Sequence, residues 1–227
     1  MANKLLIGIV DEKEEEIVNI RQTMKLSDYT DENMIEYEFI NINPSLDEFC
    51  CEEKILDFVI GKIQNKEIFS LIVDYELIVN GGFLKGSNIV EKLKQIVPLF
   101  PIVILTQKIE DSINEKITDC DKIYEKGLFF DLESDYHFEK MKNITTNCIK
   151  YKDILFDLLN EHNEIIAKYN KLKSESSRGE MIERLLENET VLQKYYPIDD
   201  TVADRTINAE VFKNILENLK QIKDELE

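Results

Sequence analysis

Residues 5–12 read Leu-Leu-Ile-Gly-Ile-Val-Asp-Glu, a short apolar run that stops at two carboxylates. Short apolar runs of this kind, rich in β-branched residues, predict buried strands of a parallel sheet. Three later runs also stop at polar residues: residues 69–73 before Asp74, residues 102–105 before Thr106, and residues 122–124 before Glu125 and Lys126.

The polar residues that follow these strands are expected to meet. In a parallel α/β sheet, ligands bind beyond the carboxyl ends of the strands. Three carboxylates (Asp11, Glu12 and Asp74), one hydroxyl (Thr106) and one ammonium group (Lys126) would therefore lie at one edge. Such a group of side chains can hold Mg²⁺ and handle a phosphoryl group.

The first 130 residues alternate short strands with helical stretches, which predicts an α/β fold with a doubly wound, five-stranded parallel sheet. Ser45 is expected to cap the second helix, and residues 80–82 (Asn-Gly-Gly) are typical of a turn. The predicted strands are residues 5–10, 35–42, 69–73, 102–105 and 122–125, and the predicted helices are residues 14–24, from 45, 87–96 and 111–117.

Beyond residue 131 the pattern is helical throughout, so we expect an α/β domain over residues 1–138 and an all-α region over residues 139–227. Residues 141–172 carry apolar side chains at heptad spacing, which predicts a partly coiled-coil seam. The seam either pairs with a second subunit or packs on the helices at residues 181–195 and 212–226, and its length favours a homodimer through this tail. Further helices are expected at residues 180–195 and from residue 209. The last carries an apolar stripe: Phe212, Ile215, Leu219, Ile222 and Leu226.

Composition excludes several classes of function. The chain has 227 residues and a formal net charge of −18, which argues against binding to a nucleic-acid backbone. Four cysteines without a Cys-x-x-Cys pair, together with two histidines, make a zinc site improbable. The sequence shows no signal-peptide pattern and no apolar run long enough to cross a membrane, so a cytoplasmic location without membrane contact is expected.

The order and spacing of these residues resemble the receiver domain of two-component response regulators, which has a flavodoxin-like fold. Gly82, eight residues after Asp74, matches the glycine that opens the third helix in that family. The resemblance implies that Asp74 is the phosphoacceptor, with Thr106 and Lys126 binding the phosphoryl group. It also implies that Mg²⁺ is held by Asp11, Glu12, Asp74 and the backbone carbonyl of Glu76.

By this resemblance the chain is a signalling protein rather than an enzyme. It would accept a phosphoryl group on Asp74 from a sensor histidine kinase or a phosphotransfer protein, and would transmit the state through its helical tail. The alternatives are an adaptor, a phosphate sink, or a pseudo-receiver that binds a partner without chemistry. Gly127 and Ile123 depart from the family pattern and indicate an altered signalling surface.

Two further features have competing interpretations. His162 lies among acidic residues and could serve a relay phosphotransferase. A polar residue that sets the helix register is the simpler interpretation. Residues 14–16 are three glutamates that we expect to be solvated in the first turn of a helix.

Overall fold

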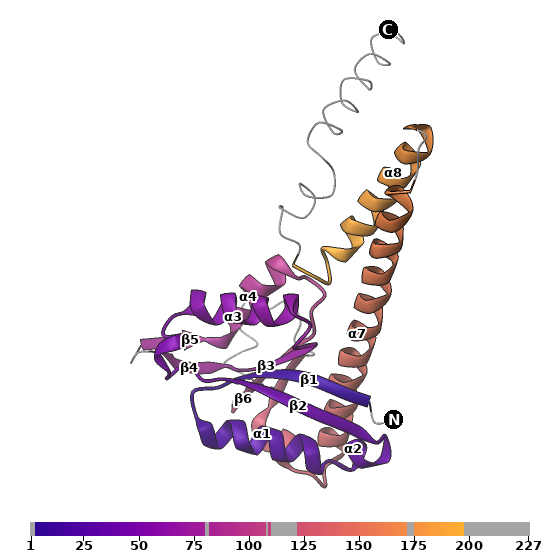
Figure 1. Cartoon of the computed structure of the whole chain (residues 1–227). Helices are drawn as coiled ribbons and strands as arrows, with labels where there is room; N and C mark the ends of the chain where they lie inside the picture. The colour runs from indigo at the N-terminus through magenta and orange to yellow at the C-terminus, as the bar shows by residue number, and fades with distance from the viewer. Residues whose placement is uncertain (1–2, 80–81, 108, 110–121, 172–174, 198–227) are drawn as a thin grey trace.

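The computed structural model describes residues 3–79, 82–107, 109, 122–171 and 175–197. Its centre is a five-stranded parallel sheet with the strand order β2-β1-β3-β6-β7 (Figure 1). The strands of this sheet are β1 (Asn3–Val10), β2 (Ile35–Ile42), β3 (Ser70–Asp74), β6 (Ile102–Thr106) and β7 (Ile123–Glu125).

The prediction of an α/β, doubly wound parallel sheet is confirmed, and its order is that of flavodoxin-like folds. Every residue of β3 and β6 is buried, which explains their continuous apolar sequences. The direction of winding reverses between β1 and β3, whose register runs from Ile7 beside Ser70 to Val10 beside Val73. The residues that follow these two strands therefore flank the crevice where such sheets bind ligands.

Helices cover both faces of the sheet. α3 and α4 lie on one face, and α1 and α2 lie on the other (Figure 1). The remaining helices follow β7, and α7 packs against α2 and β3. The helices are α1 (Glu14–Leu26), α2 (Asp28–Glu32), α3 (Glu52–Gln64), α4 (Gly86–Ile96), α6 (Lys126–Phe130), α7 (Asp135–Tyr169) and α8 (Glu175–Leu192).

The predicted start of the second helix at Ser45 is wrong. The chain forms a short 3₁₀ turn, η1 (Asp47–Phe49), and the helix α3 begins only at Glu52. The Ser45 hydroxyl and backbone N–H both donate to Asn43 Oδ1, at 2.6 and 2.9 Å. Ser45 thus stabilises a local turn with Asn43 and caps no helix.

An additional hairpin, which the sequence analysis did not predict, separates β3 from α4. Its strands β4 (Glu76–Val79) and β5 (Gly82–Lys85) are antiparallel, with Val79 paired to Gly82. Of the predicted turn at residues 80–82, residues 80 and 81 lie outside the described part. Gly82 is a strand residue, so its match to the glycine that opens the third helix in receiver domains is wrong. The helix predicted at residues 87–96 is confirmed as α4, which begins at Gly86.

The long helix α7 runs unbroken through residue 138, where a domain boundary was expected. The seam predicted on it is buried within the chain, against the sheet along the first half and beside α8 along the second. No coiled coil between subunits is required to cover it, so the argument for a homodimer through this seam loses its premise. The buried seam residues are Met141, Ile144, Cys148, Tyr151, Leu155, His162 and Ile165.

Some of the predicted helices lie partly or wholly outside the residues that the structure describes. The helices expected at residues 111–117 and from residue 209 lie outside it. The helix expected at residues 180–195 is α8, which begins earlier, at Glu175, and passes through Gly179. Among the described helices, none has both the length and the apolar character needed to cross a bilayer.

Burial of the α7 seam against the sheet predicts a specific stability pattern. Ile144 is 1% exposed, whereas Ile154 on the same helix is 40% exposed. Ile144→Ala should lower the free energy of unfolding by about 2–5 kcal/mol, because it leaves a cavity in the core. The matched control Ile154→Ala should cost clearly less. Urea denaturation followed by circular dichroism measures both, and equal losses would contradict the packing described here.

Candidate functional site

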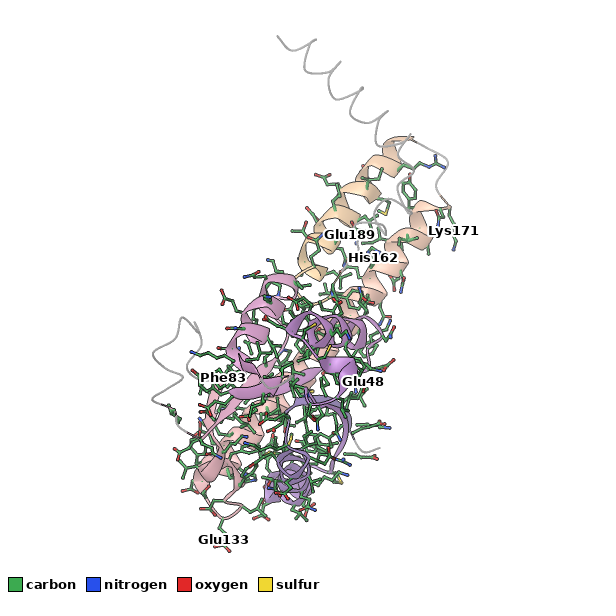
Figure 2. All side chains as sticks on the ribbon, turned by 90° about the vertical axis from the view of Figure 1, so that its left-hand side faces the viewer. Glu48, Phe83, Glu133, His162, Lys171 and Glu189 are labelled. Carbon is green, nitrogen blue, oxygen red and sulfur yellow. The ribbon has the colours of Figure 1, made fainter. Side chains whose placement is uncertain are left out.

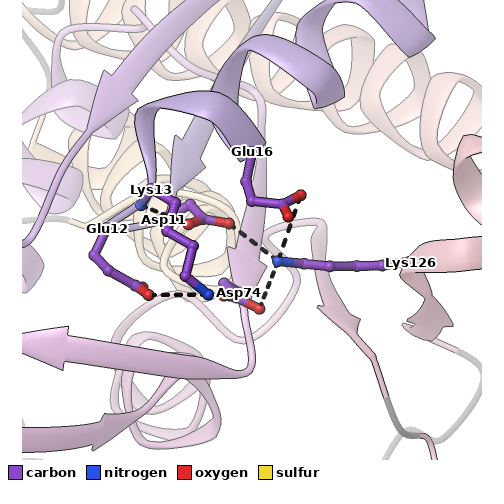
Figure 3. A network of polar contacts seen from close by, with 6 residues as sticks. All are labelled: Asp11, Glu12, Lys13, Glu16, Asp74 and Lys126. Atoms are coloured by element: carbon purple, nitrogen blue, oxygen red, sulfur yellow. Dashed lines mark hydrogen bonds and ion pairs between the residues drawn. The ribbon is translucent and has the colours of Figure 1, made fainter.

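Three carboxylates gather at the carboxyl edge of the sheet. Asp11 follows β1, Asp74 is the last residue of β3, and Glu12 follows Asp11 (Figure 3). One oxygen from each lies within 4.8 Å of the others. Asp11 is fully buried and Asp74 is 6% exposed. The sequence-based prediction that these three residues meet is confirmed.

Lys126 lies between two of these carboxylates. It is the first residue of α6, directly after β7, and it is buried. Its Nζ is 3.0 Å from Asp74 Oδ1 and 3.2 Å from Asp11 Oδ2 (Figure 3). The ammonium group therefore offsets the repulsion that two buried carboxylates would otherwise exert on each other.

Glu16 joins the site, and the prediction that it is simply solvated is wrong. Its Oε2 is buried and lies 4.0 Å from Lys126 Nζ. α1 begins at Glu14, so Glu16 lies in its first turn, near the end of β1. The only sequence signal was its place in the first turn of the helix that follows β1.

The carboxylates fit a bound cation. Asp11 Oδ1 accepts from the Lys13 backbone N–H at 2.9 Å, and Glu12 Oε1 is 3.5 Å from Lys13 Nζ. Glu12 Oε2, however, is buried without a hydrogen-bond partner in the described part of the chain. A buried, unpartnered carboxylate oxygen is costly unless a cation or water compensates it. The cluster of Asp11, Glu12 and Asp74 could hold a metal ion.

A cleft of ≈ 180 Å³ opens beside this cluster. Thr106, the last residue of β6, is 3% exposed and lines the cleft together with Asp74 and Lys126. Glu76 also lines it, at the start of β4, so four of the six expected site residues line this cavity. The other two, Asp11 and Glu12, are not among its lining residues. That the Glu76 carbonyl is a metal ligand stays a prediction.

Burial and the neighbouring charges shift the pKa values of Asp74 and Lys126. Burial, reinforced by Asp11 and Glu12 and opposed by Lys126, raises the pKa of Asp74 to about 6. Burial by itself would lower the pKa of Lys126, but attraction to Asp74 and Asp11 outweighs it and raises that pKa. Lys126 thus keeps its positive charge throughout the range in which Asp74 titrates.

Gly86, the first residue of α4, packs directly against the backbone of Asp74. Its backbone N–H donates to Tyr75 O at 2.7 Å, and a Cβ atom on Gly86 would lie 2.0 Å from Asp74 O. Only glycine allows α4 to start this close to the end of β3. The sequence analysis missed this residue because the hairpin of β4 and β5 lengthens the segment between Asp74 and α4.

Neither histidine belongs to the site. His162 lies far along α7, next to Glu189 of α8 (Figure 2), and is 9% exposed. His137 is buried, with Nδ1 2.6 Å from Phe129 O and Nε2 2.8 Å from Ser27 Oγ. The carbonyl can only accept, so Nδ1 donates to it, and in the neutral imidazole Nε2 then accepts from the Ser27 hydroxyl. His137 therefore anchors the start of α7 to the Ser27 turn.

Comparison with known proteins adds no assignment. The chain matches none of the known protein families in a scan, and a search of curated proteins finds no significant match.

The raised pKa of Asp74 predicts pH-dependent stability in the absence of divalent cations. The ordinary pKa is 3.8 and the folded value is about 6, so the folded protein binds the extra proton between them. The stability contribution is therefore complete below the ordinary pKa and lost as the pH rises through about 6. Asp74→Asn removes this loss, and thermal melting should show it gaining up to about 3 kcal/mol over wild type between pH 4 and pH 7.5. A difference that does not change with pH would contradict this.

The contact behind Asp74 predicts a large effect of a single methyl group. Gly86→Ala should cost about 2 kcal/mol or more in stability and displace the Asp74 backbone. In the matched control Gly82→Ala, the nearest atom would be Val79 O at 3.4 Å, an ordinary contact. Chemical denaturation, with divalent-cation binding by calorimetry, compares the two variants. If both behave alike, Gly86 does not position Asp74.

Proposed function

We propose that this protein is a response-regulator-like phosphoacceptor, in which Asp74 takes a phosphoryl group from a phosphohistidine of a partner protein. The observation that carries the proposal is the arrangement around Lys126, whose ammonium group lies 3.0 Å from Asp74 and 3.2 Å from Asp11. This arrangement faces a cleft that Thr106 also lines. The partner would be a sensor histidine kinase or a phosphotransfer protein.

The metal of the proposal is Mg²⁺. Asp11, Glu12 and Asp74 would hold it, with the Glu76 carbonyl as a further ligand, since Mg²⁺ prefers a few carboxylates and keeps several waters. When bound, Mg²⁺ would neutralise charge on the phosphoryl oxygens. The unpartnered Glu12 Oε2 supports a cation at this place.

The chain's own side chains would perform the transfer. The ionised Asp74 carboxylate attacks phosphorus. The phosphorus–oxygen bond forms as the phosphorus–nitrogen bond breaks, and the donor imidazole keeps the bonding electron pair. Lys126 offers a fixed positive charge to the phosphoryl oxygens, and the Thr106 hydroxyl donates a hydrogen bond to one of them. With a pKa of about 6, Asp74 is mostly ionised at neutral pH.

The other functions fit less well. A relay through His162 requires that a partner's aspartate reach its imidazole, yet His162 is buried beside Glu189, with Nε2 3.9 Å from Glu189 Oε1. An adaptor or pseudo-receiver would use the same fold without phosphorylation. Under the proposed function, by contrast, α7 would pass the phosphorylated state on to a downstream partner, because it packs on the sheet and continues beyond it.

The test is phosphorylation by acetyl phosphate with Mg²⁺. Intact mass spectrometry should show one added phosphoryl group that is labile to hydroxylamine, and Asp74→Asn should abolish it. Glu12→Gln should slow labelling at least about tenfold through loss of a metal ligand. The matched control Glu14→Gln changes an exposed glutamate two residues away and should be neutral. Calorimetric titration with Mg²⁺ alone should show weaker binding in Glu12→Gln than in wild type and unchanged binding in Glu14→Gln.

Two results would contradict the proposal. A stable phosphoryl group on serine or threonine would exclude the acyl-phosphate mechanism. An unmodified chain that still binds Mg²⁺ would favour the pseudo-receiver alternative.

A further inference from the structure

The second half of α7 extends beyond the sheet and pairs with α8 as a two-helix hairpin (Figures 1 and 2). Ile165 and Leu185 are buried between the two helices, with Ile166 and Met181 packed against them. Two paired helices leave two flanks, one on each side of their contact line. The side chains on these two flanks differ in character.

One flank is closed by polar contacts. Arg184 Nη2 lies 3.7 Å from Glu161 Oε1. The Asn188 side chain donates to Glu161 Oε2 and to Leu158 O, both at 3.4 Å. The side chains of Arg184 and Glu161 are about half exposed, so water reaches the charged groups of this flank and it needs no apolar covering. Asn188 is buried beneath them, and its Oδ1 has no hydrogen-bond partner in the described part of the chain.

The opposite flank, which we call the 159–186 flank, is mostly apolar, with the pair of His162 and Glu189 at its centre. On α7, Leu159, His162 and Ile166 share one face because they are three and four residues apart. On α8, the residues Ile182, Leu186 and Glu189 share one face for the same reason. The contact between His162 Nε2 and Glu189 Oε1, at 3.9 Å, joins the two faces (Figure 2).

The 159–186 flank is only partly covered by the described residues. Leu186 is 45% exposed, and Leu159 and Ile166 are half-buried. His162 and Glu189 are nearly buried between them, and His162 Nδ1 has no hydrogen-bond partner in the described part. A stripe of this kind is typical of the interface of a three-helix bundle from which one helix is missing.

We infer that the 159–186 flank is the docking surface for the chain's own residues 212–226. Their apolar residues, Phe212 to Leu226, recur at alternating intervals of three and four, which is the period of a helix that packs along a helical seam. As a helix, these 15 residues would span about 22 Å, the length of α7 from Leu155 to Tyr169.

The path of the chain allows this docking. The last described residues are held at the base of the hairpin: Leu99 donates its N–H to Lys194 O at 2.9 Å, and the Tyr196 hydroxyl donates to Gln64 O at 2.7 Å. The 14 residues between Pro197 and Phe212 can reach up to about 45 Å. That reach is enough for residues 212–226 to run back along the hairpin and to complete a bundle of three helices.

Hydrogen–deuterium exchange of the full chain tests this docking, with light scattering to report its mass. In wild type, residues 212–226 should be protected in a monomer. Leu219→Asp places a charge in the stripe and should speed exchange at least about tenfold in residues 212–226 and in residues 181–189. The matched control Asn218→Asp adds the same charge one position away and should leave both segments protected.

A reciprocal pair changes the docking surface itself. Leu159→Asp should release residues 212–226, whereas Asn160→Asp, at the neighbouring exposed position, should not. Exchange in β3 reports that the sheet remains folded in every variant.

Three results would overturn the inference. The first is a lack of protection of residues 212–226 in wild type. The second is unchanged exchange of residues 181–189 in Leu219→Asp. The third is protection that disappears on dilution together with a dimer mass, which would mean that a second copy covers the flank.

Discussion

The structure depends on placing two carboxylates side by side in the interior without letting them repel each other. Asp11 and Asp74 end neighbouring strands, and the Lys126 ammonium group lies about 3 Å from each. At such distances in a protein interior, electrostatic energies reach several kcal/mol. The contact exists only because β7 pairs with β6 in the register that sets Glu125 beside Thr106, and Lys126 follows directly. A shift of one residue would turn its side chain to the opposite face of the sheet.

Much of the sheet and its edge could be predicted from the sequence. Buried parallel strands need continuous apolar residues, so their ends are visible wherever a polar residue follows, as at Asp11, Asp74 and Thr106. The topology then brings these ends together without any knowledge of side-chain contacts. The meeting of Asp11, Glu12 and Asp74 followed from the parallel arrangement of the strands, which places their carboxyl ends at one edge of the sheet.

The features that escaped prediction depend on contacts between distant residues. Gly82 lies eight residues after Asp74, the spacing of the glycine in receiver domains. In this chain, however, the hairpin of β4 and β5 fills that place, and the residue packed against the Asp74 backbone is Gly86, where a Cβ atom would meet Asp74 O. The α7 heptads indicated a helical seam correctly but could not show which surface covers it. Likewise, no sequence pattern around His137 indicates that its side chain forms a hydrogen bond with Ser27, 110 residues earlier in the chain.

The continuity of α7 has a mechanical consequence. Its 35 residues form one rod of about 52 Å, with one end held in the core and the other beyond the sheet. The half that lies beyond the sheet is about 26 Å long, so a bend of about 5° where it leaves the sheet would move its far end by about 2 Å. A displacement of that size is in the range of the helix shifts that separate two packing arrangements at an interface. In this geometry a small adjustment near the sheet would be enlarged at the far end of the hairpin.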